Sequence, residues 1–401
     1  MATPTEISTE QPPTQGEDAE STTPTSPPPL ERRGSGFLNF FTSILGAKNP
    51  LAQPADATKN SVWLFDNTAY QNGDDGQWQA EVVACIFEKE GRDDVGKFVA
   101  NIADQVGIDG EVGGNTVARK RIEERVRPFL DPVSPTKTLT LLESEQTHAL
   151  GPSDSNGIIS QTVNMASEGM SDGISVQPQV QGFSLAMPTN TLFAAPEGWL
   201  VISDIDDTIK ITQTSESTGI LRTTFVDDPQ PTPGMPEFYK HVHAELNPTW
   251  FYLSASPYNL YPFLHGFLHS TYCPGTLVLR DYSWLDLSGL IKSFTEKTLE
   301  YKVDRMEKIR RWFPRRRVLC IGDSTQKDPE AYGDMYRKYP DWVHAIIIRK
   351  VTYVQGMEEK NKDERFEAAF KDVPRHMWTV FEDPEKLYGF VDGLGMEDQV
   401  L

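Results

Sequence analysis

The chain has 401 residues and a formal net charge of −20, which argues against a nucleic-acid-binding protein and against nonspecific adhesion to anionic membranes. No apolar run approaches the roughly 20 residues of a membrane-spanning helix, so any contact with a membrane is expected to be peripheral. The three cysteines are scattered and two lie in apolar runs, which is typical of reduced core residues and predicts a cytoplasmic protein.

Residues 1–60 are rich in Pro, Ser, Thr, Gly and Glu and poor in apolar residues, so we expect a disordered tail. Within it, residues 36–46 place aromatic and aliphatic side chains on one broad helical face. We interpret this segment as a short amphipathic membrane anchor, with docking on the folded body as an equal alternative. Residues 26–30 read Ser-Pro-Pro-Pro-Leu and predict a polyproline II segment that an adaptor domain can bind.

Residues 61–195 are expected to form a separate, smaller domain of mixed, β-rich structure. Apolar patterns predict three strands and two helices here. The strands are 62–65, 78–87 and 138–142, and the helices are 95–106 and 117–126. Residues 151–181 are rich in Ser, Gly and Gln, and they fit either further strands or a long loop. Nothing in this region indicates a reaction.

An apolar run at residues 199–202 ends at two carboxylates, Asp204 and Asp206, which Thr208 follows. Such a run is typical of a parallel-sheet strand, and open α/β sheets bind ligands at the carboxyl ends of their strands. Residues two apart in extended chain point the same way, so both carboxylates are expected to face one small volume. Their mutual repulsion favours a bound divalent cation or a carboxyl group that keeps its proton. Helix capping by these residues is the plainer alternative.

Ser254 directly follows a second apolar run at 250–253, where a hydroxyl group is placed to donate to a phosphoryl oxygen. Ser254 is preferred to Ser256, although the spacing leaves a shared role open, and a turn residue is the plainer alternative. A helix is expected at 235–246 and a further strand at 275–280.

Residues 298–313 have the periodicity of a helix that carries Lys302 near its start. A lysine at that position lies at the ligand-binding end of the sheet, where its charge offsets carboxylates and phosphoryl oxygens. Lys292, Lys297 and Lys308 are rival candidates, and a solvated surface lysine is the plainer alternative.

A third apolar run, which begins at Arg317, ends at Gly322 and Asp323, and Asp328 follows. Mg²⁺ prefers oxygen ligands, so carboxylates from separate strand ends suffice to hold it. Asp323 is the expected direct ligand, whereas Asp328 also fits a helix N-cap. A strand at 343–349 brings the expected total to five, separated by helices, and this order predicts a doubly wound parallel sheet.

These segments, in this order, resemble the four motifs of the haloacid dehalogenase superfamily of the DxDxT type. The resemblance implies an α/β catalytic domain of that kind at residues 196–392, followed by a C-terminal tail at 393–401. The interval between Thr208 and the strand at 250–253 is too short for a large cap domain, so the site is expected to be open from above.

The chemistry of such a site assigns a role to each candidate. Asp204 is expected to be the nucleophile that forms an aspartyl-phosphate, and Asp206 the acid that protonates the leaving alkoxide and then takes a proton from water. The phosphate is expected to be oriented by Thr208, Ser254 and Lys302, with Ser254 and Lys302 binding its oxygens. The ligands expected for Mg²⁺ are Asp204, the backbone carbonyl of Asp206, Asp323 and Asp328.

Four segments of the chain resemble one family within this superfamily, the fungal actin-patch-associated phosphatidate phosphatases. These are residues 252–261, 279–281 and 322–332 and, upstream, 62–70. The resemblance implies Mg²⁺-dependent removal of phosphate from phosphatidic acid at a membrane surface, giving diacylglycerol, in hydrolases linked to endocytic actin sites. The motifs leave two alternatives open: a phosphoprotein or other phosphomonoester phosphatase, and a cortical actin adaptor in which catalysis is secondary.

Seven apolar side chains follow Ser254 at helical spacing, and packing in the core is favoured over contact with lipid. They are Tyr258, Leu260, Tyr261, Phe263, Leu264, Phe267 and Leu268.

Overall fold

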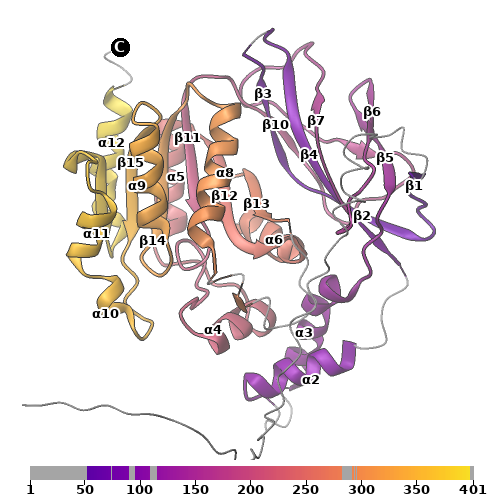
Figure 1. Cartoon of the computed structure of the whole chain (residues 1–401), viewed down its shortest axis with the longest axis horizontal. Coiled ribbons are helices and arrows are strands. Elements are labelled where there is room, and N and C mark those ends of the chain that lie inside the picture. The colour runs from indigo at the N-terminus through magenta and orange to yellow at the C-terminus, as the bar shows by residue number, and fades with distance from the viewer. Residues whose placement is uncertain are drawn as a thin grey trace, which may run out of the picture. The chain divides into compact units, whose positions relative to one another are not determined.

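The computed structural model describes residues 52–73, 75–89, 95–108, 115–281, 291–292, 294 and 296–397 (Figure 1). The predicted membrane anchor at 36–46 and the proline-rich segment at 26–30 lie outside the described residues. The predicted tail extends to residue 60, but Gln53–Pro54 already pairs with a strand at Lys137 and Thr138. Regular structure therefore begins a few residues earlier than predicted.

The second half of the chain builds a six-stranded sheet in which all neighbouring strands run parallel. From edge to edge the strands are β13 (Thr276–Arg280), β12 (Thr249–Pro257), β11 (Trp199–Asp204), β14 (Arg317–Asp323), β15 (Val343–Arg349) and β16 (Trp378–Phe381). The strand order reverses at β11, between β12 and β14, and ligands of open α/β sheets bind at such a switch point. The predicted α/β fold with a parallel sheet is confirmed.

Helices cover both faces of this sheet. In β11, Leu200 and Ile202 share a buried cluster with α8 (Thr298–Trp312) and α9 (Asp328–Lys338). Trp199 and Val201 share another with α5 (Met235–Leu246) and α6 (Tyr261–Thr271), because alternate residues of a strand face opposite sides. Burial on both faces explains the continuous apolar runs of these strands.

The remaining helical segments of the second half are short. They are α4 (Ser217–Leu221), the π-helical turn η2 (Arg222–Val226), α10 (Met357–Lys360), α11 (Asp363–Ala369), α12 (Tyr388–Glu397) and 3₁₀ turns at Tyr258–Leu260, Arg375–Met377 and Pro384–Leu387. Among the described helices, none is both long and apolar enough to cross a bilayer.

The first half of the described chain contains two mixed sheets, one of four and one of six strands, which confirms the predicted β-rich region. One sheet holds β1 (Gln53–Pro54), β5 (Lys137–Glu143), β6 (Gln146–Leu150) and β9 (Gln179–Val180). The other holds β2 (Asn60–Leu64), β3 (Asn67–Gln71), β4 (Trp78–Glu88), β7 (Ile158–Asn164), β8 (Ser175–Val176) and β10 (Thr191–Phe193). Leu64 and Ile86 of one sheet share a buried cluster with Leu139 and Leu141 of the other. Two helices, α2 (Val95–Gln105) and α3 (Asn115–Leu130), follow β4.

One buried cluster crosses the predicted boundary between residues 195 and 196. Phe65 stacks on Tyr261 with ring centroids 3.8 Å apart, and Phe129 of α3 packs edge-on against Phe225 of η2 at 5.7 Å. The domain limits at 195 and 392 stay predictions, and α12 continues through residue 392 to Glu397.

Candidate active site

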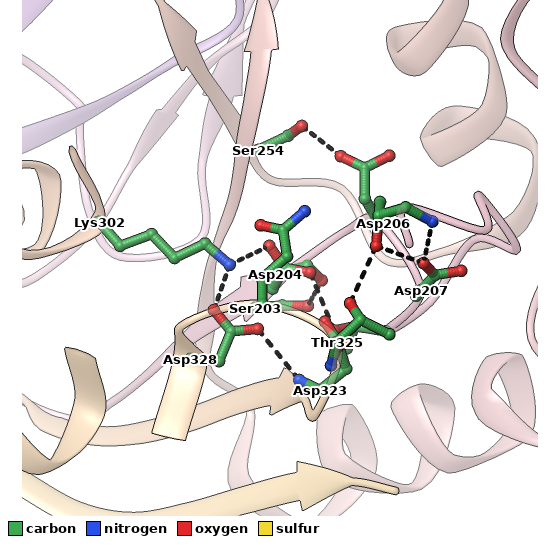
Figure 2. Close-up of polar contacts among 12 residues, drawn as sticks. Ser203, Asp204, Asp206, Asp207, Ser254, Lys302, Asp323, Thr325 and Asp328 are labelled. Carbon is green, nitrogen blue, oxygen red and sulfur yellow. Dashed lines mark hydrogen bonds and ion pairs between the residues drawn. The ribbon is translucent and has the colours of Figure 1, made fainter. Parts of the chain in front are cut away.

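The predicted site residues lie together at the carboxyl ends of the central strands (Figure 2). Asp204 is the last residue of β11, Ser254 lies in the second half of β12, and Asp323 is the last residue of β14. Asp328 begins α9, and Lys302 lies near the start of α8. Each of these five residues is at most 1% exposed, so the sheet edge holds an enclosed polar cluster.

The carboxylates of Asp204, Asp323 and Asp328 form what we call the carboxylate triad. Each offers an oxygen, and the three oxygens lie within 4.8 Å of one another. The Lys302 ammonium bridges two of them, since Nζ lies 2.6 Å from Oδ1 of Asp204 and also donates to Oδ1 of Asp328. Thr208 Oγ1 lies 3.0 Å from Oδ2 of Asp204 and 3.2 Å from Oδ2 of Asp323, so it is placed to donate to either carboxylate.

Burial and mutual repulsion make the fully ionised triad unfavourable. Burial, and then the charge of Asp328, raises the pKa of Asp204 well above its usual range. The same two causes raise the pKa of Asp323 to about 7. Burial disfavours the charge of Lys302, but Asp204 and Asp328 outweigh it and raise the pKa of the ammonium group. One lysine offsets only part of the triad's negative charge, and such an all-oxygen donor set fits a hard divalent cation.

Lys302 differs from its three rivals in position. Lys292 and Lys297 are exposed, and Lys308 donates to Glu81 at 2.6 Å. Lys302 shares the buried face of α8 with Met306, and helical spacing turns this face toward the sheet. Of the four lysines, Lys302 therefore lies at the triad.

The Asp206 carboxylate points away from the triad and toward Ser254 (Figure 2). Ser254 Oγ donates to its Oδ2 at 2.5 Å, and Thr212 Oγ1 donates to its Oδ1 at 2.9 Å. Lys210 Nζ lies 3.9 Å from the same Oδ1, and burial lowers the pKa of this lysine. The Asp206 side chain is thus separate from the triad. The backbone carbonyl of Asp206 remains the group predicted to bind the metal.

Ser254, the predicted phosphate ligand, has other partners in the structure. Its hydroxyl donates to Asp206 and accepts the backbone N–H of Ser256 at 3.0 Å. The Ser256 hydroxyl is buried and has no hydrogen-bond partner among the described residues. A role shared between the two serines therefore stays open.

Sequence reasoning assigns no role to Asp207, but this residue anchors the loop that follows β11. It is buried, and its φ of 64° lies in the left-handed region, which aspartate tolerates better than most residues. Its carboxylate accepts the backbone N–H groups of Thr212, Gln213 and Thr214 at 2.7–2.9 Å and the Tyr353 hydroxyl at 3.0 Å. Aspartate in a turn is a known sequence signal, although it does not identify the N–H groups that will be bound.

We expect Asp207→Ala to lower the free energy of unfolding by about 3–5 kcal/mol, because two buried N–H groups and one half-buried N–H group lose a charged acceptor. Asp207→Asn keeps an acceptor oxygen and tolerates the positive φ, so its loss should be clearly smaller. Urea denaturation of the two variants measures the difference. Equal losses, both below about 1 kcal/mol, would contradict the anchoring role.

Gly322 allows Asp328 to approach the end of β14. A Cβ atom at position 322 would lie 2.6 Å from both Cβ and Oδ2 of Asp328, closer than side chains pack. The same Oδ2 accepts the backbone N–H of Asp323 at 3.0 Å, so this close approach fixes two members of the triad.

Gly322→Ala is expected to destabilise the fold by about 1–3 kcal/mol and to weaken metal binding, because it displaces Asp328. The matched control is Gly266→Ala on α6, where a Cβ meets nothing within 4 Å. Helix propensity predicts that the control is up to about 1 kcal/mol more stable than the parent. Denaturation of both variants with and without Mg²⁺ measures their stability and their stabilisation by the ion. If Mg²⁺ stabilised Gly322→Ala as much as the parent, the assignment of Asp328 to the metal site would be contradicted.

The prediction that no large cap domain lies between the first two motifs agrees with the structure, in which α4, η2 and α5 separate β11 from β12. The side chains of the site are nevertheless buried. Asp206 is 2% exposed and the triad no more than 1%. The loops after β11 and β14 meet near the strand ends, where Thr214 Oγ1 donates to Thr325 Oγ1 at 3.0 Å. Lys360 adds a hydrogen bond to the Thr325 carbonyl at 2.7 Å. Short loops thus help to enclose the site because their polar groups pair with one another.

Core packing is confirmed for six of the seven apolar residues after Ser254, all of which are buried. Phe263 also packs against this core. It is half-buried, and its ring lies 4.5 Å from the guanidinium carbon of Arg125.

Comparison with known proteins finds similarity over the region that holds this site. Residues 199–350 match the family model described as phosphatidate phosphatase APP1, catalytic domain. The chain is 30% identical over 177 residues to phosphatidate phosphatase APP1 of Saccharomyces cerevisiae. The aligned segment covers 43% of this chain and 29% of the relative. It is 28% identical over 159 residues to an uncharacterized protein of Schizosaccharomyces pombe. This aligned segment covers 38% of this chain and 25% of the relative. The chain thus spans less than a third of the length of the curated relatives it matches.

Proposed function

We propose that residues 199–350, which match the family model of the phosphatidate phosphatase APP1 catalytic domain, hydrolyse phosphatidic acid to diacylglycerol and phosphate with Mg²⁺ as cofactor. The observation that carries this proposal is the enclosed carboxylate triad with Lys302, next to the separate Asp206–Ser254 pair. A site that transfers a phosphoryl group needs positive charge next to the phosphate, and it needs an acid for the leaving group.

The triad fits Mg²⁺ because its donors are carboxylate oxygens that are buried and only partly neutralised by Lys302. We assign the ion to Asp204, Asp323 and Asp328, together with the backbone carbonyl of Asp206. When bound, Mg²⁺ neutralises the phosphate dianion so that a carboxylate can approach the phosphorus atom.

Asp204 is the proposed nucleophile. One of its carboxylate oxygens forms a bond to phosphorus as the bond between phosphorus and the diacylglycerol oxygen breaks. Asp206 gives its proton to the departing alkoxide. A water molecule then attacks the phosphorus of the aspartyl-phosphate, Asp206 takes its proton, and free Asp204 and phosphate result.

The surrounding side chains hold these groups in place. Ser254 and Thr212 bind the two oxygens of Asp206 and fix the direction of its carboxyl group. Thr208 orients Asp204, and Lys302 lies where its charge meets both the nucleophile and a phosphoryl oxygen. Ser254 is also our candidate phosphate ligand once Asp206 shifts toward the leaving group.

The test is release of phosphate from phosphatidate in mixed micelles by the full chain, with Mg²⁺ or with a chelator and with a phosphopeptide as competing substrate. We expect Mg²⁺-dependent release from the lipid and a loss of about 10²–10⁴-fold in Asp206→Asn. Asp304→Asn is the matched control, because this carboxylate is 68% exposed and pairs with Arg305 outside the site. Cleavage of the phosphopeptide without turnover of the lipid would refute phosphatidate as the substrate and support a phosphoprotein phosphatase.

We also propose that the enzyme works at membranes near cortical actin, a proposal supported only by the resemblance to the fungal family. Imaging of a tagged chain together with an actin marker tests this location. A uniform distribution of the tagged chain that does not follow actin patches would refute it.

A further inference from the structure

Three metal-ligating side chains converge at a second place, away from the carboxylate triad. Asp66 lies between β2 and β3, whereas His265 and His269 lie one turn apart on α6. Nε2 of His265 is 3.0 Å from Oδ2 of Asp66, and Nε2 of His269 is 3.2 Å from the same oxygen. All three ligand atoms lie within 4.8 Å of one another, and the two imidazole rings are 4.2 Å apart between centroids.

These separations are those of neighbouring ligands around one ion. Atoms bound about 2.0–2.1 Å from a metal ion lie about 2.9–3.4 Å apart in octahedral or tetrahedral geometry. His265 is 6% exposed, and its Nε2 makes no hydrogen bond of acceptable geometry among the described residues despite its closeness to Asp66. A buried imidazole nitrogen therefore faces the Asp66 carboxylate without a well-aligned hydrogen bond.

The carboxylate is held ready for such a role by its own contacts. Asn190 donates its backbone N–H to Oδ1 of Asp66 at 2.7 Å, which leaves Oδ2 directed at the two histidines. The backbone N–H of Asp66 donates to the Tyr261 hydroxyl at 2.8 Å, and Phe65 stacks on the Tyr261 ring. Outer contacts of this kind orient ligands at metal sites.

The donor set defines the class of ion. Two imidazole nitrogens and one carboxylate suit Zn²⁺ and related transition metals, whereas Mg²⁺ prefers oxygen ligands only. Three protein ligands leave at least one position for water, and the His269 side chain is 37% exposed, so solvent reaches the site. We propose that Asp66, His265 and His269 bind one zinc-class divalent cation, which ties the β2–β3 turn to α6.

The proposal is tested on the full chain with Zn²⁺ and Co²⁺ alone as probes, in excess Mg²⁺ to occupy the carboxylate triad. We expect one equivalent of Zn²⁺ by calorimetry, a visible Co²⁺ absorption typical of nitrogen ligation, and a higher midpoint of thermal unfolding with Zn²⁺. His269→Ala should weaken Zn²⁺ binding by at least about 10–100-fold and remove the thermal shift. His269→Cys, which restores a zinc ligand, should recover binding.

The matched control is His241→Ala. His241 on α5 also faces a carboxylate, since its Nε2 lies 2.8 Å from Oδ1 of Asp392. This pair lies on other elements than the cluster of Asp66, His265 and His269. Zn²⁺ binding should be unchanged in this variant. Binding that survives His269→Ala, or that is lost in His241→Ala instead, would overturn the proposal and leave Asp66 as an ion-pair partner of two histidines. Thermal unfolding in chelator shows that each variant folds.

Discussion

Asp204→Asn is expected to abolish phosphate release, with a loss of at least about 10⁴-fold, because an amide cannot form the phosphoryl bond. The fold should survive this change. Burial and Asp328 raise the pKa of Asp204, so its ionised form destabilises the metal-free protein at neutral pH, and the uncharged amide removes that effect. We therefore expect a midpoint of thermal unfolding in chelator that is no lower than that of the parent.

The control for Asp204→Asn is again Asp304→Asn, an exposed carboxylate whose removal should change neither activity nor stability. Activity of Asp204→Asn within tenfold of the parent would exclude Asp204 as the nucleophile. Lost activity together with an unfolded circular dichroism spectrum would instead assign Asp204 a structural role, contrary to our expectation.

Lys302→Met should cause a large loss of stability in the catalytic region. Lys302 is 1% exposed, and in the part of the chain that the structure describes it is the cation paired with Asp204 and Asp328. Removing it leaves buried carboxylates without a partner, which costs about 3–5 kcal/mol in comparable cases. Urea denaturation in chelator at neutral pH measures this loss, and adding Mg²⁺ should restore part of it.

Two further variants make the result specific to the triad. The double variant Lys302→Met/Asp328→Asn should be more stable than Lys302→Met alone, because the second change removes one unpaired carboxylate. Lys308→Met, on the same helix as Lys302, removes a partly buried pair with Glu81 of β4 and should cost clearly less than Lys302→Met. Similar losses in Lys302→Met and Lys308→Met would contradict a special role for Lys302.

The central strands and helices could be predicted because each is long and has one dominant pattern. β11, β14 and β15 each contain a continuous apolar run since both faces are covered, and α5 has the predicted limits. β16 has only four residues with a partly exposed pattern, and no periodicity marks so short an edge strand. In the first half, β3, β6 and β10 are likewise too short, at three to five residues, for a periodic pattern to mark them.

Sequence spacing placed the site residues at one sheet edge, but it did not determine their partners. Strand ends bring Asp204, Ser254 and Asp323 together by topology alone. The hydrogen bond from Ser254 to Asp206 and the enclosure of the site depend on loop conformations that no motif specifies. The anchoring role of Asp207 depends on the conformation of its own loop in the same way, whereas the partners of Asp66 lie far away in the chain.

The most direct test of the proposed mechanism is to trap the phosphorylated enzyme. The full chain is mixed with phosphatidate and Mg²⁺, quenched in acid within milliseconds, and the peptide that contains Asp204 is weighed. We predict a mass increase of one phosphoryl group on Asp204. Phosphate release without any labelled Asp204, or with the label on another residue, would contradict the account.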